Sequence, residues 1–175
     1  FKEYWDLVRK YPQYQGGFIW DFVDQGLRDK SKITGKPIYA YGGDYGRFAM
    51  SDENFNNNGL VSPDRVPNPH AYEVQYILQN IWSNLADKKS GKVSVFNENF
   101  FVPLNNVILD YAIEAEGKVL SNGTINLDKY NILPQTSKTI AIPNYGKVVG
   151  DKKNKGKEIV LNLRYKLNSD ASLLK

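Results

Sequence analysis

The first ten residues carry apolar side chains at helical spacing. Phe1, Trp5 and Val8 recur at intervals of three or four, and charged residues fill most of the positions between them. This pattern predicts an amphipathic helix over residues 1–10. The helix should end at Tyr11-Pro12, because proline disfavours helical backbone in the residue before it.

A short apolar run follows at residues 18–23. It is rich in aromatic and β-branched side chains and does not alternate with polar ones, which favours a strand buried on both faces. A helix directly before such a strand is typical of an α/β fold. We therefore predict an inner strand of a parallel sheet or barrel.

We predict that residues 26–69 form an unusually long connection, because they contain several glycine-rich and asparagine-rich turn motifs. Long irregular segments in compact domains are usually functional. Asn68-Pro69 then predicts a helix start, with the asparagine as cap and the proline in the first turn. Apolar residues continue at helical spacing as far as Ile81.

Beyond Trp82 the pattern changes to short segments typical of strands. The predicted strands span residues 92–96, 107–115, 118–127, 138–142 and 158–167. Glu116-Gly117 predicts a tight turn between the second and third of them. We interpret this part as an antiparallel β-sandwich and place a domain boundary near Leu85, which gives domains at residues 1–84 and 85–175.

Both domains are predicted to be incomplete. The first contains one strand of a sheet or barrel, and the second stops at Leu173-Leu174-Lys175, short of the roughly 100 residues of a seven-stranded sandwich. The chain also begins with Phe1 rather than methionine. We therefore expect a fragment of a longer protein.

Composition narrows the classes of function. Hydrophobic residues make up 41% and charged residues 24% of the 175 residues, values typical of a globular protein. No run approaches the roughly 18 apolar residues of a membrane span, so no membrane partner is expected. The absence of cysteine excludes disulfides and thiolate metal sites. We interpret the one histidine, His70, as a surface residue, because a single histidine without cysteines does not make a typical zinc site.

The net charge of +4 comes largely from a cluster of lysines among glycines. The cluster comprises Lys147, Lys152, Lys153, Lys155 and Lys157. Because the segment has no apolar periodicity, it predicts a solvated hairpin loop rather than a nucleic-acid interface.

Candidate chemistry lies at the end of the predicted inner strand. In barrel enzymes the site is built at the C-terminal ends of the strands, which selects Trp20, Asp21 and the loop that follows. A tryptophan there can pack against a sugar ring, although burial in the core is the common alternative. Asp21 and Asp24 are three residues apart on a strand, so their side chains would face opposite sides and are poor candidates for a catalytic pair.

Four motifs occur together in a characteristic order. They are QGGFIWDFVDQ at residues 15–25, AYGGDYG at residues 40–46, Asn58-Gly59-Leu60-Val61, and Asp64-Arg65. Residues 1–82 thereby resemble glycoside hydrolase family 2, in its β-galactosidase branch. The resemblance implies the last strand, long loop and helix of a (β/α)8 TIM-barrel catalytic domain, followed by an incomplete immunoglobulin-like sandwich.

The resemblance also implies residue roles and an activity. The parent enzyme would hydrolyse terminal β-D-galactosides with retention, in carbohydrate metabolism. Trp20 would stack on the galactose, and the Phe55 ring would move over the pocket. Sodium would be bound by the backbone oxygen of Phe55 and the side chain of Asn58, with an acidic third ligand upstream. Asn56-Asn57 departs from the family pattern in this loop.

The same resemblance places the two catalytic glutamates on earlier strands, and no glutamate here matches their motifs. We expect no catalytic residue in this chain, an inactive isolated chain, and any Mg²⁺ sites of the full-length enzyme elsewhere. The expected partners are a galactoside, the rest of the parent enzyme and further copies of itself in a homo-oligomer. Bacterial cytoplasm and periplasm are both compatible with the sequence.

An alternative is a non-catalytic carbohydrate-binding or interaction module. Sandwiches commonly carry such surfaces, and exposed tyrosines would form this one. The candidates are Tyr111, Tyr130, Tyr145 and Tyr165. Burial of these rings between the sheets would instead indicate a spacer domain, which is the role that the resemblance implies.

Overall fold

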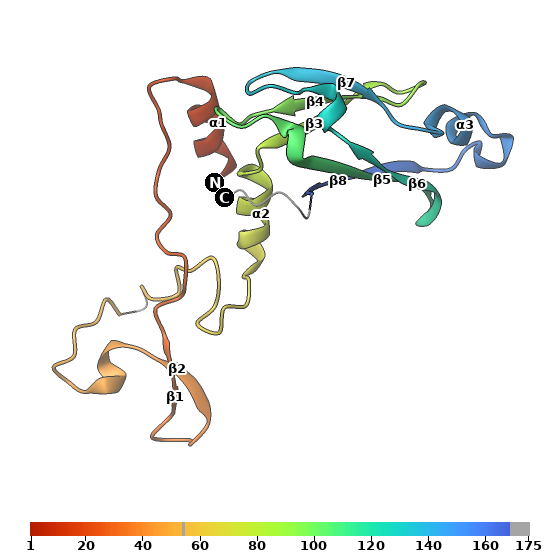
Figure 1. The fold of residues 1–175 in the computed structure, drawn as a ribbon. Coiled ribbons are helices and arrows are strands. Elements are labelled where there is room, and N and C mark those ends of the chain that lie inside the picture. Colours follow the sequence, from red (N-terminus) through yellow and green to blue (C-terminus); the bar gives the residue numbers. More distant parts are fainter. Residues whose placement is uncertain (54, 169–175) are drawn as a thin grey trace. The chain divides into compact units, whose positions relative to one another are not determined.

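A computed structural model describes residues 1–53 and 55–168. The chain divides into two compact units, Phe1–Gln79 and Asn80–Lys175 (Figure 1). The predicted boundary near Leu85 falls inside strand β3 (Ile81–Asp87), which pairs with β4 (Lys92–Asn97) of the second unit. The predicted end of the sandwich at residues 173–175 lies outside the described residues.

The first unit contains the two predicted helices, α1 (Lys2–Lys10) and α2 (Pro69–Ile77). At the start of α1 the Phe1 and Trp5 rings stack, with centroids 5.4 Å apart. The Arg9 guanidinium donates a hydrogen bond of 2.7 Å to the Ile77 carbonyl, at the end of α2. Helix α2 ends earlier than predicted because Ile81 begins β3.

The prediction of a doubly buried strand at residues 18–23 is wrong for this chain. Among the described residues this segment makes one isolated parallel bridge, between Val23 and Val61. Phe18, Trp20 and Phe22 are exposed. An inner strand of a parallel sheet needs a neighbour along each edge and a helix over each face. Within the described part of the chain, this segment has backbone partners only at residues 58–61, along one edge.

The connection over residues 26–69 is more ordered than predicted. It contains the antiparallel hairpin β1 (Leu27–Lys30) and β2 (Pro37–Ala40), followed by a 3₁₀ turn at Gly42–Tyr45. The sequence LRDK of β1 has no alternation to reveal it, and all four of its residues are exposed. Pairing with β2 rather than local pattern defines this strand.

The second unit is an antiparallel sandwich, as predicted. One sheet has the order β3-β4-β7, where β7 is Ser137–Ala141. The other has the order β6-β5-β8, formed by β5 (Val107–Ala115), β6 (Lys118–Asn126) and β8 (Ile159–Leu167). Figure 1 shows the two sheets as stacked layers. Alternate residues of β5 are buried between them.

The core of the sandwich includes side chains from both sheets. Its fully buried members include Val93, Val95, Leu109, Ile113 and Ile140. Burial of each such side chain contributes about 1.5–3 kcal/mol to the stability of the fold. The turn at Glu116-Gly117 is confirmed, since both residues have positive φ, at 49° and 76°, as a tight hairpin turn requires.

The lysine-rich segment is not a hairpin loop. It forms the short helix α3 (Tyr145–Gly150) and a 3₁₀ turn at Lys152–Asn154. These link β7 of one sheet to β8 of the other, so the connection crosses between layers rather than folding back on one sheet. The lysines themselves are exposed, as expected. Within the described residues, no helix has both the length and the apolar character needed to cross a membrane.

Candidate functional site

The Trp20 segment and the Asn58 segment run side by side. The Asp21 amide donates to the Asn58 carbonyl over 3.0 Å, and the Leu60 amide donates to the Asp21 carbonyl over 3.0 Å. A few residues on, the Asp24 amide donates to the Val61 carbonyl over 2.9 Å. The structure therefore brings two of the predicted site residues, Trp20 and Asn58, onto adjoining backbone.

Gly59 lies at a close contact between these segments. A Cβ atom at this position would lie 2.1 Å from the Asp24 nitrogen and 2.5 Å from the Val61 oxygen. Contacts that short to backbone atoms leave room only for glycine. The Gly59 amide donates to the Asp24 carboxylate over 2.7 Å.

Two further side chains hold the Gly59 carbonyl. The Asn68 amide nitrogen donates to it over 2.9 Å, and the His70 Nε2 lies at the same distance from it. Asn68 was expected to cap α2, but its side chain makes no capping hydrogen bond. His70 is exposed, as expected of a surface residue, yet its ring contacts the site backbone.

The roles of Asp24, Asn68 and His70 were not predicted. Asp24 is 35 residues from Gly59 in sequence, so no local pattern reveals the contact. Asp21, by contrast, makes a local interaction, because its carboxylate accepts a hydrogen bond of 2.6 Å from the Phe22 amide. The Asp24 carboxylate holds the backbone of Gly59 in place.

The aromatic candidates are open to solvent. Trp20 is 71% exposed and Phe55 is 59% exposed. An exposed indole beside hydrogen-bonding backbone offers a flat surface for a sugar ring. Trp20 is thus not the buried core residue of the alternative interpretation.

Asn58 has an unusual environment. Its amide nitrogen is buried and has no hydrogen-bond partner within the described part of the chain. A buried polar atom without a partner is costly. The oxygen and nitrogen of an asparagine exchange places by rotation of the amide, which would direct the oxygen into this position. Within residues 1–53 and 55–168, no hydrogen bond reaches the Phe55 carbonyl oxygen.

These two oxygens suit a hard monovalent cation, which prefers carbonyl and carboxylate ligands. The described residues contain no group of three or more histidine, aspartate or glutamate side chains able to hold a metal ion. A backbone carbonyl oxygen at Phe55 and an amide oxygen at Asn58 are the donor types that the resemblance implies for sodium.

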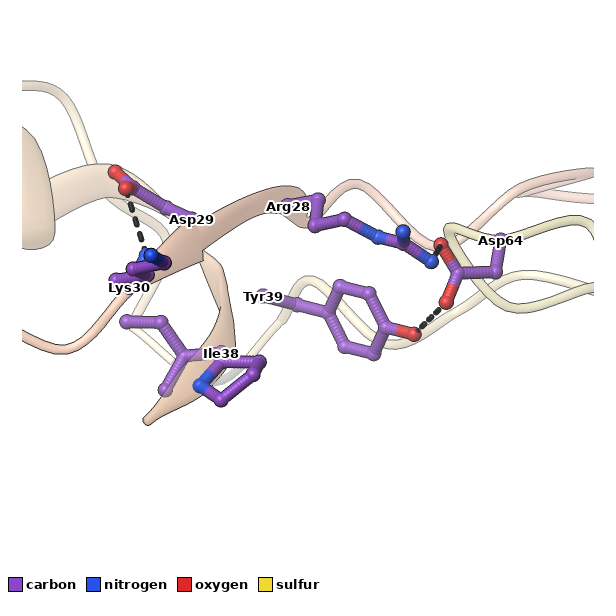
Figure 2. A pocket seen from close by; sticks show the side chains of 7 residues that line it. Arg28, Asp29, Lys30, Ile38, Tyr39 and Asp64 are labelled. Atoms are coloured by element: carbon purple, nitrogen blue, oxygen red, sulfur yellow. Dashed lines mark hydrogen bonds and ion pairs between the residues drawn. The ribbon is translucent and has the colours of Figure 1, made fainter. Parts of the chain in front are cut away.

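A second polar cluster fixes the β1–β2 hairpin to the segment after Val61. Figure 2 shows Arg28 and Tyr39 pointing toward Asp64. The Arg28 guanidinium donates to Asp64 Oδ1 over 2.5 Å, and the Tyr39 hydroxyl donates to Oδ2. All three side chains line an open cleft together with Asp29, Lys30, Pro37 and Ile38.

The cluster shifts the pKa of each member. The hydrogen bond from Arg28, followed by that from Tyr39, lowers the pKa of the Asp64 carboxyl. Asp64 in turn raises the pKa of the Arg28 guanidinium and of the Tyr39 hydroxyl through the same hydrogen bonds. Both oxygens of Asp64 are engaged, so the cluster acts as a clamp on the hairpin.

Comparison with known families covers both units. Residues 1–83 match the family model described as "Glycosyl hydrolases family 2, TIM barrel domain", and residues 93–175 match that described as "Beta-galactosidase, domain 4". The chain belongs to the β-galactosidase branch of glycoside hydrolase family 2. The fold expected from the resemblance is thereby confirmed at the level of a C-terminal barrel portion followed by a sandwich.

Curated relatives of this family 2 chain agree with that placement. A beta-galactosidase of Leuconostoc mesenteroides is 39% identical over 145 residues, which cover 81% of this chain and 14% of the relative. One of Clostridium acetobutylicum is 40% identical over 141 residues, 81% of this chain and 15% of the relative. Beta-galactosidase 2 of Enterobacter cloacae is 39% identical over 127 residues, 73% of this chain and 12% of the relative.

The family 2 chain therefore spans roughly one seventh of the length of the curated relatives it matches.

Proposed function

We propose that this chain is part of a retaining β-galactosidase that hydrolyses terminal β-D-galactosides. Trp20, Phe55 and Asn58 contribute to the galactose pocket and to a sodium site. The catalytic glutamates, and any magnesium sites, lie in other parts of the polypeptide, so the isolated chain is inactive. Assembly of the parent into a homo-oligomer belongs to the same proposal.

One observation carries the proposal. The segment with the exposed Trp20 ring is hydrogen bonded to the segment with Asn58. A galactose ring stacked on Trp20 would then lie next to the sodium ligands. Sugar sites need a flat apolar surface beside fixed polar groups, and this arrangement supplies both from adjoining backbone.

Residues 18–23 complete the proposal at the level of fold. Their apolar pattern predicts burial on both faces, but Phe18 and Phe22 are exposed in this chain. We infer that neighbouring barrel strands of the parent pair with this segment and cover it. Trp20 would then keep its ring at the mouth of the barrel, where such enzymes build their sites.

Sodium has a defined contribution in this proposal. The chain's own atoms would hold it through the Phe55 carbonyl and the Asn58 side-chain oxygen, and the bound cation would fix the loop between them. The Phe55 backbone would then be held through its carbonyl oxygen, while its ring stays free to move over the pocket. Movement of its ring on sugar binding requires a mobile loop side chain, and its exposure of 59% is consistent with that.

The test is hydrolysis of an aryl β-galactoside by the isolated chain and by the gene product extended upstream to include the earlier barrel strands. We expect activity only in the extended protein. In that protein Trp20→Ala should raise KM about tenfold through lost stacking. Phe48→Ala, at an 88% exposed phenylalanine in the connection over residues 26–69, is the control.

Sodium dependence tests the second part. Asn58→Ala in the extended protein should raise the sodium concentration needed for half-maximal activity, whereas Asn57→Ala, the exposed neighbour, should not. Hydrolysis by the short chain would overturn the assignment of catalysis to other parts of the polypeptide. Equal sodium requirements in the two variants would remove Asn58 from the cation site.

The alternative of a carbohydrate-binding sandwich loses its candidate surface. Tyr111 and Tyr145 are buried in the core, and Tyr130 and Tyr165 pack partly buried against it. Burial raises the pKa of the Tyr165 hydroxyl, and the hydrogen bond with Ser83 partly opposes this shift. Without an exposed row of these rings, a spacer role between domains is the better supported proposal.

A further inference from the structure

One end of the sandwich exposes a group of apolar side chains, which we call the Phe100 patch. It consists of Phe100, Phe101, Val102 and Leu133, with exposed fractions of 72%, 92%, 43% and 50%. The first three residues follow β4, and Leu133 lies in the connection before β7. The two phenylalanine rings are tilted at 46° with centroids 6.3 Å apart.

A fully buried asparagine joins the two loops of the patch. The Asn97 amide nitrogen donates to the Val102 carbonyl over 2.9 Å and to the Ile132 carbonyl over 3.2 Å. Its oxygen accepts from both the backbone and the side-chain nitrogen of Asn99, over 3.0 Å and 2.9 Å. These four hydrogen bonds use the full capacity of the amide. The patch is therefore presented on a fixed base.

A second side chain strengthens that base. The Gln135 amide nitrogen donates to the Glu98 carbonyl over 2.7 Å, and the Glu98 carboxylate accepts from the Trp82 indole over 2.7 Å. Protruding phenylalanines on a loop tied down at so many points are not explained by folding of the sandwich alone, because their rings remain in water. Exposed apolar groups of this kind mark interaction surfaces.

The polar surroundings decide which kind of partner fits. A sugar would need free donors and acceptors beside the rings, whereas the amide nitrogens of Asn99 and Gln135 and one carboxylate oxygen of Glu98 already form hydrogen bonds within the domain. Anionic lipid or nucleic acid would need cations, and residues 97–106 and 132–136 contain only one charged side chain, that of Glu98. The chemistry favours an apolar protein surface.

The size of the patch decides where that surface lies. Independent protein partners usually contribute roughly 20–30 residues a side, far more than these four. A contact between domains of one polypeptide can be smaller, because the covalent link makes the effective concentration high. The matched relatives are about seven times as long as the part they share with this chain, so such domains are available.

We propose that the Phe100 patch inserts into an apolar pocket on another domain of the same, longer polypeptide. This rests on the proposed function only in requiring that longer polypeptide. It concerns a contact that holds the sandwich in place, and it is independent of which sugar the parent enzyme hydrolyses.

The test compares one pair of substitutions in two proteins. Phe100→Ser combined with Phe101→Ser is introduced into the 175-residue chain and into the complete gene product, and urea unfolding of the sandwich is followed in each. In the short chain we expect the double substitution to leave the urea midpoint of unfolding unchanged. In the complete protein we expect it to raise the equilibrium constant for unfolding of the sandwich at least tenfold over the unsubstituted protein. Val119→Thr, at a 54% exposed apolar position on β6, is the control and should be neutral in both.

Three outcomes would overturn the proposal. Neutral effects in both proteins would leave the patch without a partner domain, and equal destabilisation in both would make it a structural part of the sandwich. Stabilisation of the short chain by lactose, abolished by the double substitution, would make it a sugar site. If the complete protein shows the expected difference but does not hydrolyse galactosides, the proposed function fails while this inference stands.

Discussion

Replacement of Gly59 by alanine should disrupt the candidate site more than any exposed substitution near it. The added Cβ would lie 2.1 Å from the Asp24 nitrogen and 2.5 Å from the Val23 carbonyl carbon. Non-bonded heavy atoms are comfortable at about 3.5 Å, so the two segments must separate by about 1 Å or more. Hydrogen bonds do not survive such a displacement.

The cost follows from what that separation breaks. Two hydrogen bonds are lost directly, that from the Gly59 amide to the Asp24 carboxylate and that from the Asp24 amide to the Val61 carbonyl. Each contributes roughly 1 kcal/mol. Residual overpacking adds about 1–3 kcal/mol. We therefore expect a local destabilisation of at least about 3 kcal/mol, enough to open residues 20–25 without unfolding the sandwich.

Amide hydrogen exchange measures this opening at the affected positions. The Asp24 and Leu60 amides should exchange about a hundredfold faster in Gly59→Ala, as about 3 kcal/mol implies. Gly17→Ala is the matched control, because no atom lies within 4 Å of a Cβ added there. Exchange in Gly59→Ala as slow as in Gly17→Ala would refute the view that backbone contact at Gly59 joins the two segments.

The remaining predictions concern the clamp and the base of the patch. Because the pKa of Asp64 is lowered in the folded chain, its contribution is present at neutral pH and is lost as the pH falls through that lowered value. Proteolysis within β1–β2 should therefore become faster as the pH is lowered in the natural chain, whereas its rate in the Asp64→Asn variant should not change through this group. Equal pH dependence of the two proteolysis rates would contradict this prediction. Asn97→Ala should destabilise the sandwich by about 2–4 kcal/mol in urea unfolding, because the carbonyls of Val102 and Ile132 lose a buried donor. An unchanged midpoint relative to Asn105→Ala would show that the network is not stabilising.

The sequence alone predicted those elements whose residues repeat with a local period. Strand β5 was predicted at residues 107–115 and spans the same residues, with alternate side chains buried. Both helices of the first unit were predicted to within a few residues. The resemblance to glycoside hydrolase family 2 was also visible in the sequence, because the order and spacing of the motifs can be read without a structure.

Tertiary structure decided what depends on residues far apart in the chain. The tie between Asp24 and Gly59, the turn of Asn68 and His70 toward the Gly59 carbonyl, and the clamp on Asp64 all join separate segments. No periodicity encodes them, since each depends on how the backbone between the partners folds. The same reason explains the wrong prediction for residues 18–23: local pattern reports that a segment is suited to burial, whereas burial itself requires neighbours on every side.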